Sequence, residues 1–238
     1  MCGGVRGAKA ERLAPTRFWA ILRNPKFWIN GLTRAAFFAA LAILQQSVAF
    51  YTKYVLNAEG MASTIMLASV IIVAIIAVPV WVKILKKLGL MKSWRLSFVC
   101  VAISLIPLYF TGTLLTSTLA LVVLGFGYGG TCATMDLIGA RILDEDKERY
   151  GVQREGTFGS LAGVLGNTSG LFVSAGFLMV SRFYGYQSGD LPGAQPADAA
   201  RFLISIFPFI IMVICCVLSL FLRFKEESKT PGDFVTEP

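Results

Sequence analysis

Six stretches of mostly apolar residues follow one another along the chain, and each is long enough to cross a lipid bilayer as a helix. Such a crossing needs about 20 residues of this kind. The segments predicted to span the membrane are, in order, 28–52, 62–82, 96–111, 117–140, 157–181 and 202–222. Pro79, Pro107 and Pro208 lie within them and are expected to bend the helices without ending them. The pattern therefore predicts an all-α, polytopic membrane protein with six transmembrane helices.

Charged residues gather in the short segments between and around these spans. The densest segment, residues 144–156, holds eight charged side chains and must lie in water; we call it the charged island. A basic hairpin occupies 83–95, and the third span is expected to turn sharply into the fourth near Gly112. The predicted organisation is a basic leader (1–27), a six-helix transmembrane domain (28–222) and a charged tail (223–238), which is expected to be disordered.

The positive charges are distributed very unequally between the two sides of the predicted bundle. Leader, basic hairpin, charged island with Arg141, and tail together hold 18 of the 22 Lys and Arg residues, whereas the opposite loops hold Lys53, Arg182 and Arg201. Because basic residues mark the cytoplasmic side, both termini are predicted to be cytoplasmic. The sequence does not identify the cellular membrane.

Composition excludes several function classes. Of the residues, 55% are hydrophobic and 15% are charged, and the net charge of +8 is spread over short loops rather than over one face, so no nucleic-acid partner is expected. The chain has no histidine, no metal-ligand cluster and no nucleophile paired with a base, which argues against an enzyme and against a cofactor. The five cysteines are expected to pack between helices without disulfides. The glycine-rich run 125–130 is interpreted as a closely packed stretch of membrane helix.

Polar side chains of the first span fall on one face. On a helical wheel, four of them lie within about 60° of one another, and these are Asn30, Arg34, Gln45 and Thr52. Exposing this stripe to lipid is costly, about 2.5–3.5 kcal/mol for a central arginine alone. It is therefore expected to face protein or a water-filled substrate path. Arg34 has an alternative, because its long side chain can reach the cytoplasmic interface.

The fifth span carries two further stripes. Small residues at intervals of four, three and four form a face that another helix can approach closely, and they are Gly159, Gly163, Gly166 and Gly170. Beside them, Ser160, Asn167 and Ser174 repeat every seven residues. Two interpretations stay open: these side chains bond to neighbouring helices, or they line the substrate path together with the stripe of the first span.

Asp136 is the only acidic residue within a predicted span. An intramembrane carboxylate usually pairs with a cation or takes part in ion coupling. Pairing with Arg141 or another cation of the cytoplasmic side is the expected explanation, and ion coupling is the alternative.

Several segments together resemble a known family. They are residues 24–28 (NPKFW), the aromatic pair at 37–38, 50–56 (FYTKYVL), the end of the basic hairpin at 88–89, 142–146 (ILDED) and 151–156 (GVQREG). In this combination the chain resembles the C-terminal six helices of the glycoside-pentoside-hexuronide:cation symporter family of the major facilitator superfamily. Asn167 stands where that family often has a lysine, and Arg141 where it usually has an acid.

The resemblance implies a secondary active transporter that works by alternating access. It implies cation-coupled symport of a sugar or related small solute, with Na⁺ or H⁺ as the coupling ion, or symport of a lysophospholipid as in the animal branch of the family. Only half of the family's fold is matched, so a missing N-terminal six-helix half or a second copy is expected as partner. The alternative is a non-transporting membrane scaffold or half-transporter subunit.

In this scheme the charged island works as a cytoplasmic gate, whose side chains pair in one state and separate in the other. The residues assigned to the gate are Asp136, Arg141, Asp144, Glu145, Glu148, Arg149, Arg154 and Glu155. Exposed ion pairs are each worth only about 0–1 kcal/mol, so a network is required to bias the equilibrium.

Overall fold

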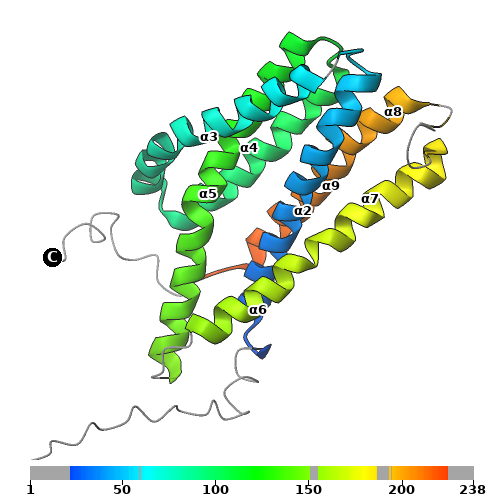
Figure 1. Cartoon of the computed structure of the whole chain (residues 1–238). Helices are drawn as coiled ribbons and strands as arrows, with labels where there is room; N and C mark the ends of the chain where they lie inside the picture. Colours follow the sequence, from blue (N-terminus) through cyan, green and yellow to red (C-terminus); the bar gives the residue numbers. More distant parts are fainter. Residues whose placement is uncertain (1–21, 59, 151–154, 187–192, 194, 225–238) are drawn as a thin grey trace, which may run out of the picture.

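The computed structural model describes residues 22–58, 60–150, 155–186, 193 and 195–224. Within these residues the chain forms helices and no strand (Figure 1). The elements are α2 (Pro25–Tyr54), α3 (Gly60–Leu88), α4 (Leu90–Phe110), α5 (Leu114–Tyr150), α6 (Glu155–Asn167), α7 (Ser169–Tyr184), α8 (Pro196–Arg201), the π-helix η1 (Phe202–Ile206) and α9 (Phe207–Phe221). Six helical segments are long and apolar enough to cross a membrane, which confirms the predicted all-α polytopic class.

The start of α2 is fixed by its sequence. The side chain of Asn24 accepts a hydrogen bond from the backbone N–H of Lys26 at 3.0 Å, and Pro25 occupies the first helical position. An asparagine cap and a proline at the first position both favour helix initiation. The helix therefore begins three residues before the predicted span.

The basic hairpin turns on a single residue. α3 continues to Leu88 and α4 begins at Leu90, and between them Gly89 has φ +80° and ψ +164°. Only glycine adopts this backbone region readily, so the reversal depends on its missing side chain. Pro79 and Pro107 lie inside α3 and α4, and both helices continue past them as predicted.

The charged island differs from the expected loop. α5 does not end near Ala140 but continues through Asp144 to Tyr150. The physical reason is that Glu, Lys and Arg are good helix formers and are well solvated once the helix has left the bilayer. The first half of the island is thus an extension of α5, and residues 151–154 lie outside the described part of the chain.

Two predicted spans are interrupted helices. The fifth span breaks at Thr168, whose hydroxyl and backbone N–H both donate to the carbonyl of Leu165. Small and hydroxylated residues around this point permit such a break. In the sixth span, η1 precedes Pro208, and the N–H of Phe207 bonds to the carbonyl of Phe202, five residues back. Proline removes a backbone donor, so the wider turn accommodates it without ending the span.

Close helix packing is concentrated on the glycine-rich run of α5. A Cβ added to Gly125 or Gly129 would lie 2.6 Å from a carbonyl oxygen of α3, one added to Gly127 would lie 2.8 Å from Val101 of α4, and one added to Gly130 would lie 2.3 Å from the Trp81 ring. The interpretation of this run as closely packed membrane helix is therefore confirmed. It draws α3, α4 and α5 into one layer.

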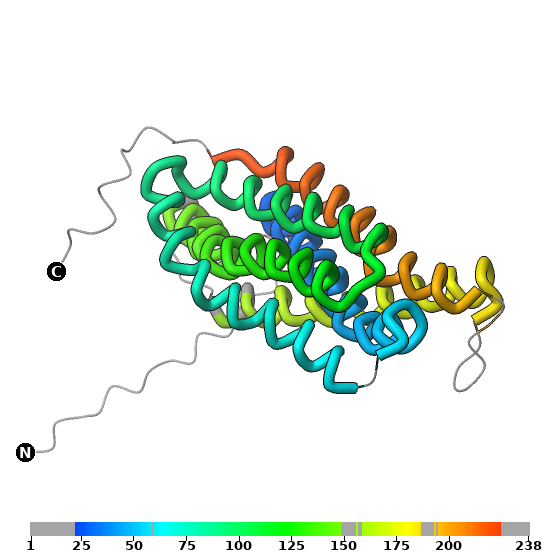
Figure 2. The backbone as a smooth tube through the Cα atoms, turned by 90° about the horizontal axis from the view of Figure 1, so that it is seen from above, coloured from blue at the N-terminus to red at the C-terminus, as the bar shows by residue number. Residues whose placement is uncertain are grey.

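α2 occupies the middle of the bundle. It contacts α9 and η1 on one side, α6 and α7 on another, and α5 and α3 on a third (Figures 1 and 2). Its inner faces are packed with fully buried residues such as Phe37, Ile43 and Tyr51. By contrast, the α6–α7 segment is mostly exposed, since only 11% of its apolar window is buried. α2 and α5 also contact each other, and exposed residues of both helices, such as Phe38 and Asp136, form what we call the open face.

Candidate functional site

The open face between α2 and α5 carries an ion pair. Nη1 of Arg34 on α2 lies 2.8 Å from Oδ1 of Asp136 on α5. The Arg34 side chain is 35% exposed and the Asp136 side chain 79% exposed. The guanidinium also lies 5.6 Å from the ring centroid of Phe38, within the range of a cation–π contact. The cation that pairs with Asp136 is thus supplied by the first span, 102 residues earlier in the chain.

A second ion pair continues the same line toward the start of α2. Lys26 of α2 pairs with Glu145 of α5. It lies eight residues before Arg34, while Glu145 lies nine residues after Asp136, as expected for two antiparallel helices in register. At 1.5 Å per residue the two pairs are about 12 Å apart along α2. Together they join the two helices at two levels.

At the same end, Phe224, three residues after the end of α9, joins this arrangement. Lys26 Nζ and Arg141 Cζ each lie 4.8 Å from the centroid of the Phe224 ring. Arg95 at the start of α4 donates to the carbonyls of Ser219 and Leu222 at 3.3 and 3.0 Å. The start of α2, the start of α4, the late part of α5 and the end of α9 therefore meet at one end of the bundle.

Polar and aromatic side chains extend the site along α5. Tyr128, Cys132 and Asp136 recur every four residues and so lie on one face of the helix. Tyr128 is half-buried and stacks on Phe37 of α2 with 6.0 Å between ring centroids, whereas Cys132 is exposed. We call the set of Arg34, Phe38, Tyr128, Cys132 and Asp136 the α2–α5 site. It combines both charges, a thiol and aromatic surface.

The other members of the stripe on α2 have different environments. Asn30 is 6% exposed, and its Oδ1 has no hydrogen-bond partner among the described residues. Gln45 is exposed, and the helical repeat places it on the same face as Arg34 and Phe38. Thr52 is buried and donates to the carbonyl of Ala49 at 3.0 Å. The stripe therefore runs from a buried amide through the ion pair to an exposed amide.

The stripe on the fifth span does not join the α2–α5 site. Ser160 and Ser174 are exposed and donate to the carbonyls of Gly156 and Gly170 in their own helices. Asn167 is exposed at the end of α6. By the helical repeat, all three lie roughly opposite the side on which Leu165 contacts Gly31 of α2.

The glycine stripe of the fifth span is open in the same way. A Cβ added to any of its four glycines would meet nothing within 4 Å among the described residues. These glycines therefore do not form the close helix contacts seen on α5.

Of the remaining gate residues, those from Arg141 to Glu148 lie along the last turns of α5. Asp144 and Glu148 are exposed, Glu145 pairs with Lys26, and Arg141 contacts Phe224. The side chains of Arg149 and Glu155, and all of Arg154, lie outside the part of the chain that the structure describes. The structure thus connects the island to α2 through Glu145, and Arg141, just before the island, to the segment after α9.

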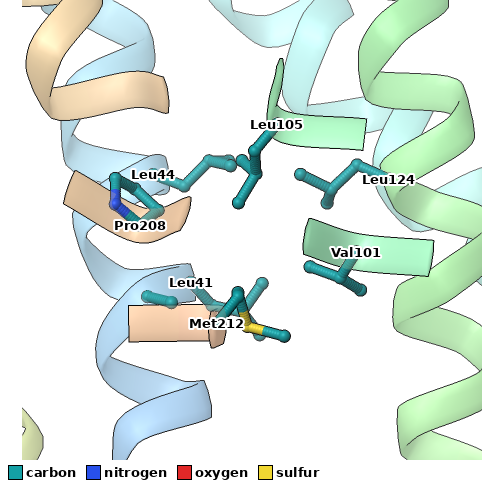
Figure 3. A pocket seen from close by; sticks show the side chains of 8 residues that line it. Leu41, Leu44, Val101, Leu105, Leu124, Pro208 and Met212 are labelled. Carbon is teal, nitrogen blue, oxygen red and sulfur yellow. The ribbon is translucent and has the colours of Figure 1, made fainter. Parts of the chain in front are cut away.

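A small cavity inside the bundle has a purely apolar lining. It lies between α2, α4, α5 and α9, with Leu44, Leu105, Leu124 and Met212 among its walls (Figure 3). A polar solute would lose its hydrogen bonds there without replacement. Among the described residues, no group of three or more His, Cys, Asp and Glu side chains is placed to bind a metal. The α2–α5 site is therefore the best candidate for polar recognition.

Comparison with known proteins places the chain in a family. A family model described as MFS/sugar transport protein matches residues 15–227. No curated protein matched the chain.

Proposed function

Because the chain belongs to the family of MFS/sugar transport proteins, within the major facilitator superfamily, we propose that it is a secondary active transporter for a sugar or related small solute. Transport would be cation-coupled symport, with Na⁺ or H⁺ as the coupling ion. It would proceed by alternating access, in which two six-helix units rock about a site near the middle of the bilayer.

The observation that carries this proposal is the exposure of Asp136. Arg34 lies six residues beyond Trp28, the first residue of the predicted span, which is about 9 Å along the helix. The ion pair therefore lies inside the membrane-spanning segment rather than at its edge. A carboxylate that is 79% exposed cannot be placed against lipid tails without a large cost. The open α2–α5 face must therefore contact water or other protein, as the wall of a solute path does.

The same face suggests how the path is completed. We infer that a second six-helix unit, either an N-terminal half or another copy, lies opposite α2 and α5. Arg34 and Gln45 would then line the α2 side of the path, and Asn30, one turn before Arg34, is buried beside it. Ser160, Asn167 and Ser174 would belong to the path only if the second unit also covers the far side of α6 and α7.

The ion pairs favour a gate at the island end of the bundle. Lys26 and Glu145 join α2 to the extension of α5, and a separation of these helices would break this pair and the Arg34–Asp136 pair together. Two coupled ion pairs shift the equilibrium toward the closed gate more than one exposed pair does. By the distribution of basic residues, this end is the cytoplasmic one.

Uptake measurements test the proposal directly. The protein is reconstituted in liposomes and supplied with labelled sugars and labelled lysophospholipid, each with and without a Na⁺ or proton gradient. We expect gradient-dependent uptake of one solute class. Arg34→Gln and Asp136→Asn should each lower that uptake at least about tenfold, because truncating one partner leaves the other charge uncompensated.

The matched control is the reversed pair, Arg34→Asp with Asp136→Arg, which keeps the net charge and the ion pair. If the reversed pair restores the amount of protein but not the uptake, the two side chains act in solute contact rather than in folding. If no solute is taken up by the wild-type protein under any gradient, the chain acts as a scaffold or as a subunit of a larger transporter. If uptake is unchanged in all variants, the α2–α5 site does not line the solute path.

A further inference from the structure

The turn between α3 and α4 carries a concentration of positive charge that has no ion-pair partner within the part of the chain that the structure describes. Lys83, Lys86 and Lys87 lie on the last turns of α3 and Lys92 on the first turn of α4, on either side of Gly89. All four side chains are exposed. We call these four residues the lysine patch.

No acidic residue offsets this patch within its own helices. From Gly60 to Met135 the sequence contains five Lys or Arg residues and no Asp or Glu. The fifth, Arg95, already donates to the carbonyls at the end of α9. Neither the ion pair of Lys26 nor that of Arg34 involves the patch. Four positive charges are thus left facing outward at one point.

The helix dipole explains only part of this arrangement. Cations in the last turn of a helix are stabilised by its carbonyl end, which accounts for Lys86 and Lys87. Lys92 lies at the opposite kind of terminus, where the dipole disfavours a cation and where α4 has no acidic residue and no side-chain cap. An external anion would compensate both the lysines and this uncapped terminus.

Apolar side chains share the same surface. Leu88, directly beside the turn, is 45% exposed, and Val82 is 42% exposed. Lysine stems pack along apolar surface while their ammonium groups reach outward. Basic residues next to exposed aliphatic residues, at the end of membrane-spanning helices, match the boundary between lipid tails and headgroups.

We propose that the lysine patch binds the headgroups of anionic phospholipids, so that the α3–α4 turn is held at a negatively charged membrane surface. Each lysine near such a surface adds to the attraction. Because the four charges lie on one turn fixed by Gly89, they act on one or a few neighbouring lipids. The binding does not depend on which solute the protein moves.

A lipid titration of the full chain tests this. The protein is purified in a neutral detergent, and its thermal unfolding midpoint is followed while phosphatidylglycerol, phosphatidylcholine or inorganic phosphate is added. We expect phosphatidylglycerol to raise the unfolding midpoint at concentrations roughly tenfold or more below those at which phosphatidylcholine does so. Inorganic phosphate should give no comparable shift, because it lacks the chains that hold the headgroup at this boundary. At high salt the preference should shrink.

Two variants localise the effect. The combined variant Lys83→Gln, Lys86→Gln, Lys87→Gln and Lys92→Gln should lose the preference while keeping the wild-type midpoint in phosphatidylcholine. The control Lys53→Gln with Arg182→Gln removes exposed charges from the last turns of α2 and α7 and should keep the preference. Equal responses to both lipids in the wild type, or a preference retained by the fourfold variant, would overturn the proposal. An equal response to inorganic phosphate would reassign the patch to a free anion.

Discussion

At the scale of single residues, missing side chains on α5 determine how closely its neighbours pack. A Cβ at Gly130 would lie 2.3 Å from the ring of Trp81, which is fully buried and whose Nε1–H donates to the carbonyl of Phe126 at 2.8 Å. The ring cannot move without losing that bond. Gly130→Ala should therefore destabilise the protein by about 1–3 kcal/mol, the usual cost of overpacking. The unfolding midpoint in detergent measures this.

Gly163 provides the matched control for this substitution. It is also a helical glycine, but a Cβ there would meet nothing within 4 Å. Gly163→Ala should be neutral or stabilise the helix by up to about 1 kcal/mol. A Gly130→Ala midpoint equal to that of the wild type would contradict the packing argument.

The sequence indicates each charged residue of the α2–α5 site separately but not that they pair with each other. The sequence predicts that Arg34 lines a path or reaches the interface and that Asp136 pairs with a cation of the cytoplasmic side. A helical wheel describes one helix at a time and does not show which helices are neighbours. The sequence does contain one signal for this pairing. The spacing of eight residues from Lys26 to Arg34 nearly equals the spacing of nine residues from Asp136 to Glu145.

At the scale of helices, the α3–α4 reversal depends on one backbone conformation. Gly89 has φ +80° and ψ +164°, which costs a residue with a Cβ about 1–3 kcal/mol. Gly89→Ala should lower the unfolding midpoint by the corresponding amount. Gly112→Ala is the control, since Gly112 also lies between two helices but is not among the described glycines with positive φ, and a Cβ there would meet nothing within 4 Å. A larger effect at Gly112 than at Gly89 would show that the hairpin is not held by its backbone angles.

The number and order of the spans could be predicted because lipid requires about 20 apolar residues per crossing. The details that sequence reasoning missed involve no change in hydrophobicity. The break at Thr168 and the π-helix before Pro208 lie inside apolar segments, where hydropathy is uniform. The extension of α5 to Tyr150 lies beyond the membrane, where charged residues form helix as readily as loop.

At the scale of the whole molecule, the question is what covers the open face of α2 and α5. The sequence favours a shared passage lined by the stripes of the first and fifth spans. Instead, Arg34 of α2 pairs with Asp136 of α5. The side chains of the other stripe lie on the side of α6 and α7 that is turned away from α2, and they belong to Ser160, Asn167 and Ser174. Hydrophobic patterning identifies polar faces but not the surfaces that assembly will cover.

Cys132 reports directly on that face. It is exposed one turn from Asp136, whereas Cys215 is fully buried and its thiol contacts the carbonyl of Thr33. If the α2–α5 face is a water-filled path, a variant retaining only Cys132 should be labelled by a charged, membrane-impermeant thiol reagent at least about tenfold faster than one retaining only Cys215, because a charged reagent does not enter lipid or a packed core. A transported solute should slow the labelling of Cys132 by occupying the same space. Equal and slow labelling of both variants in native membranes would mean that lipid or a stable partner fills the face, and the solute path would then have to lie elsewhere.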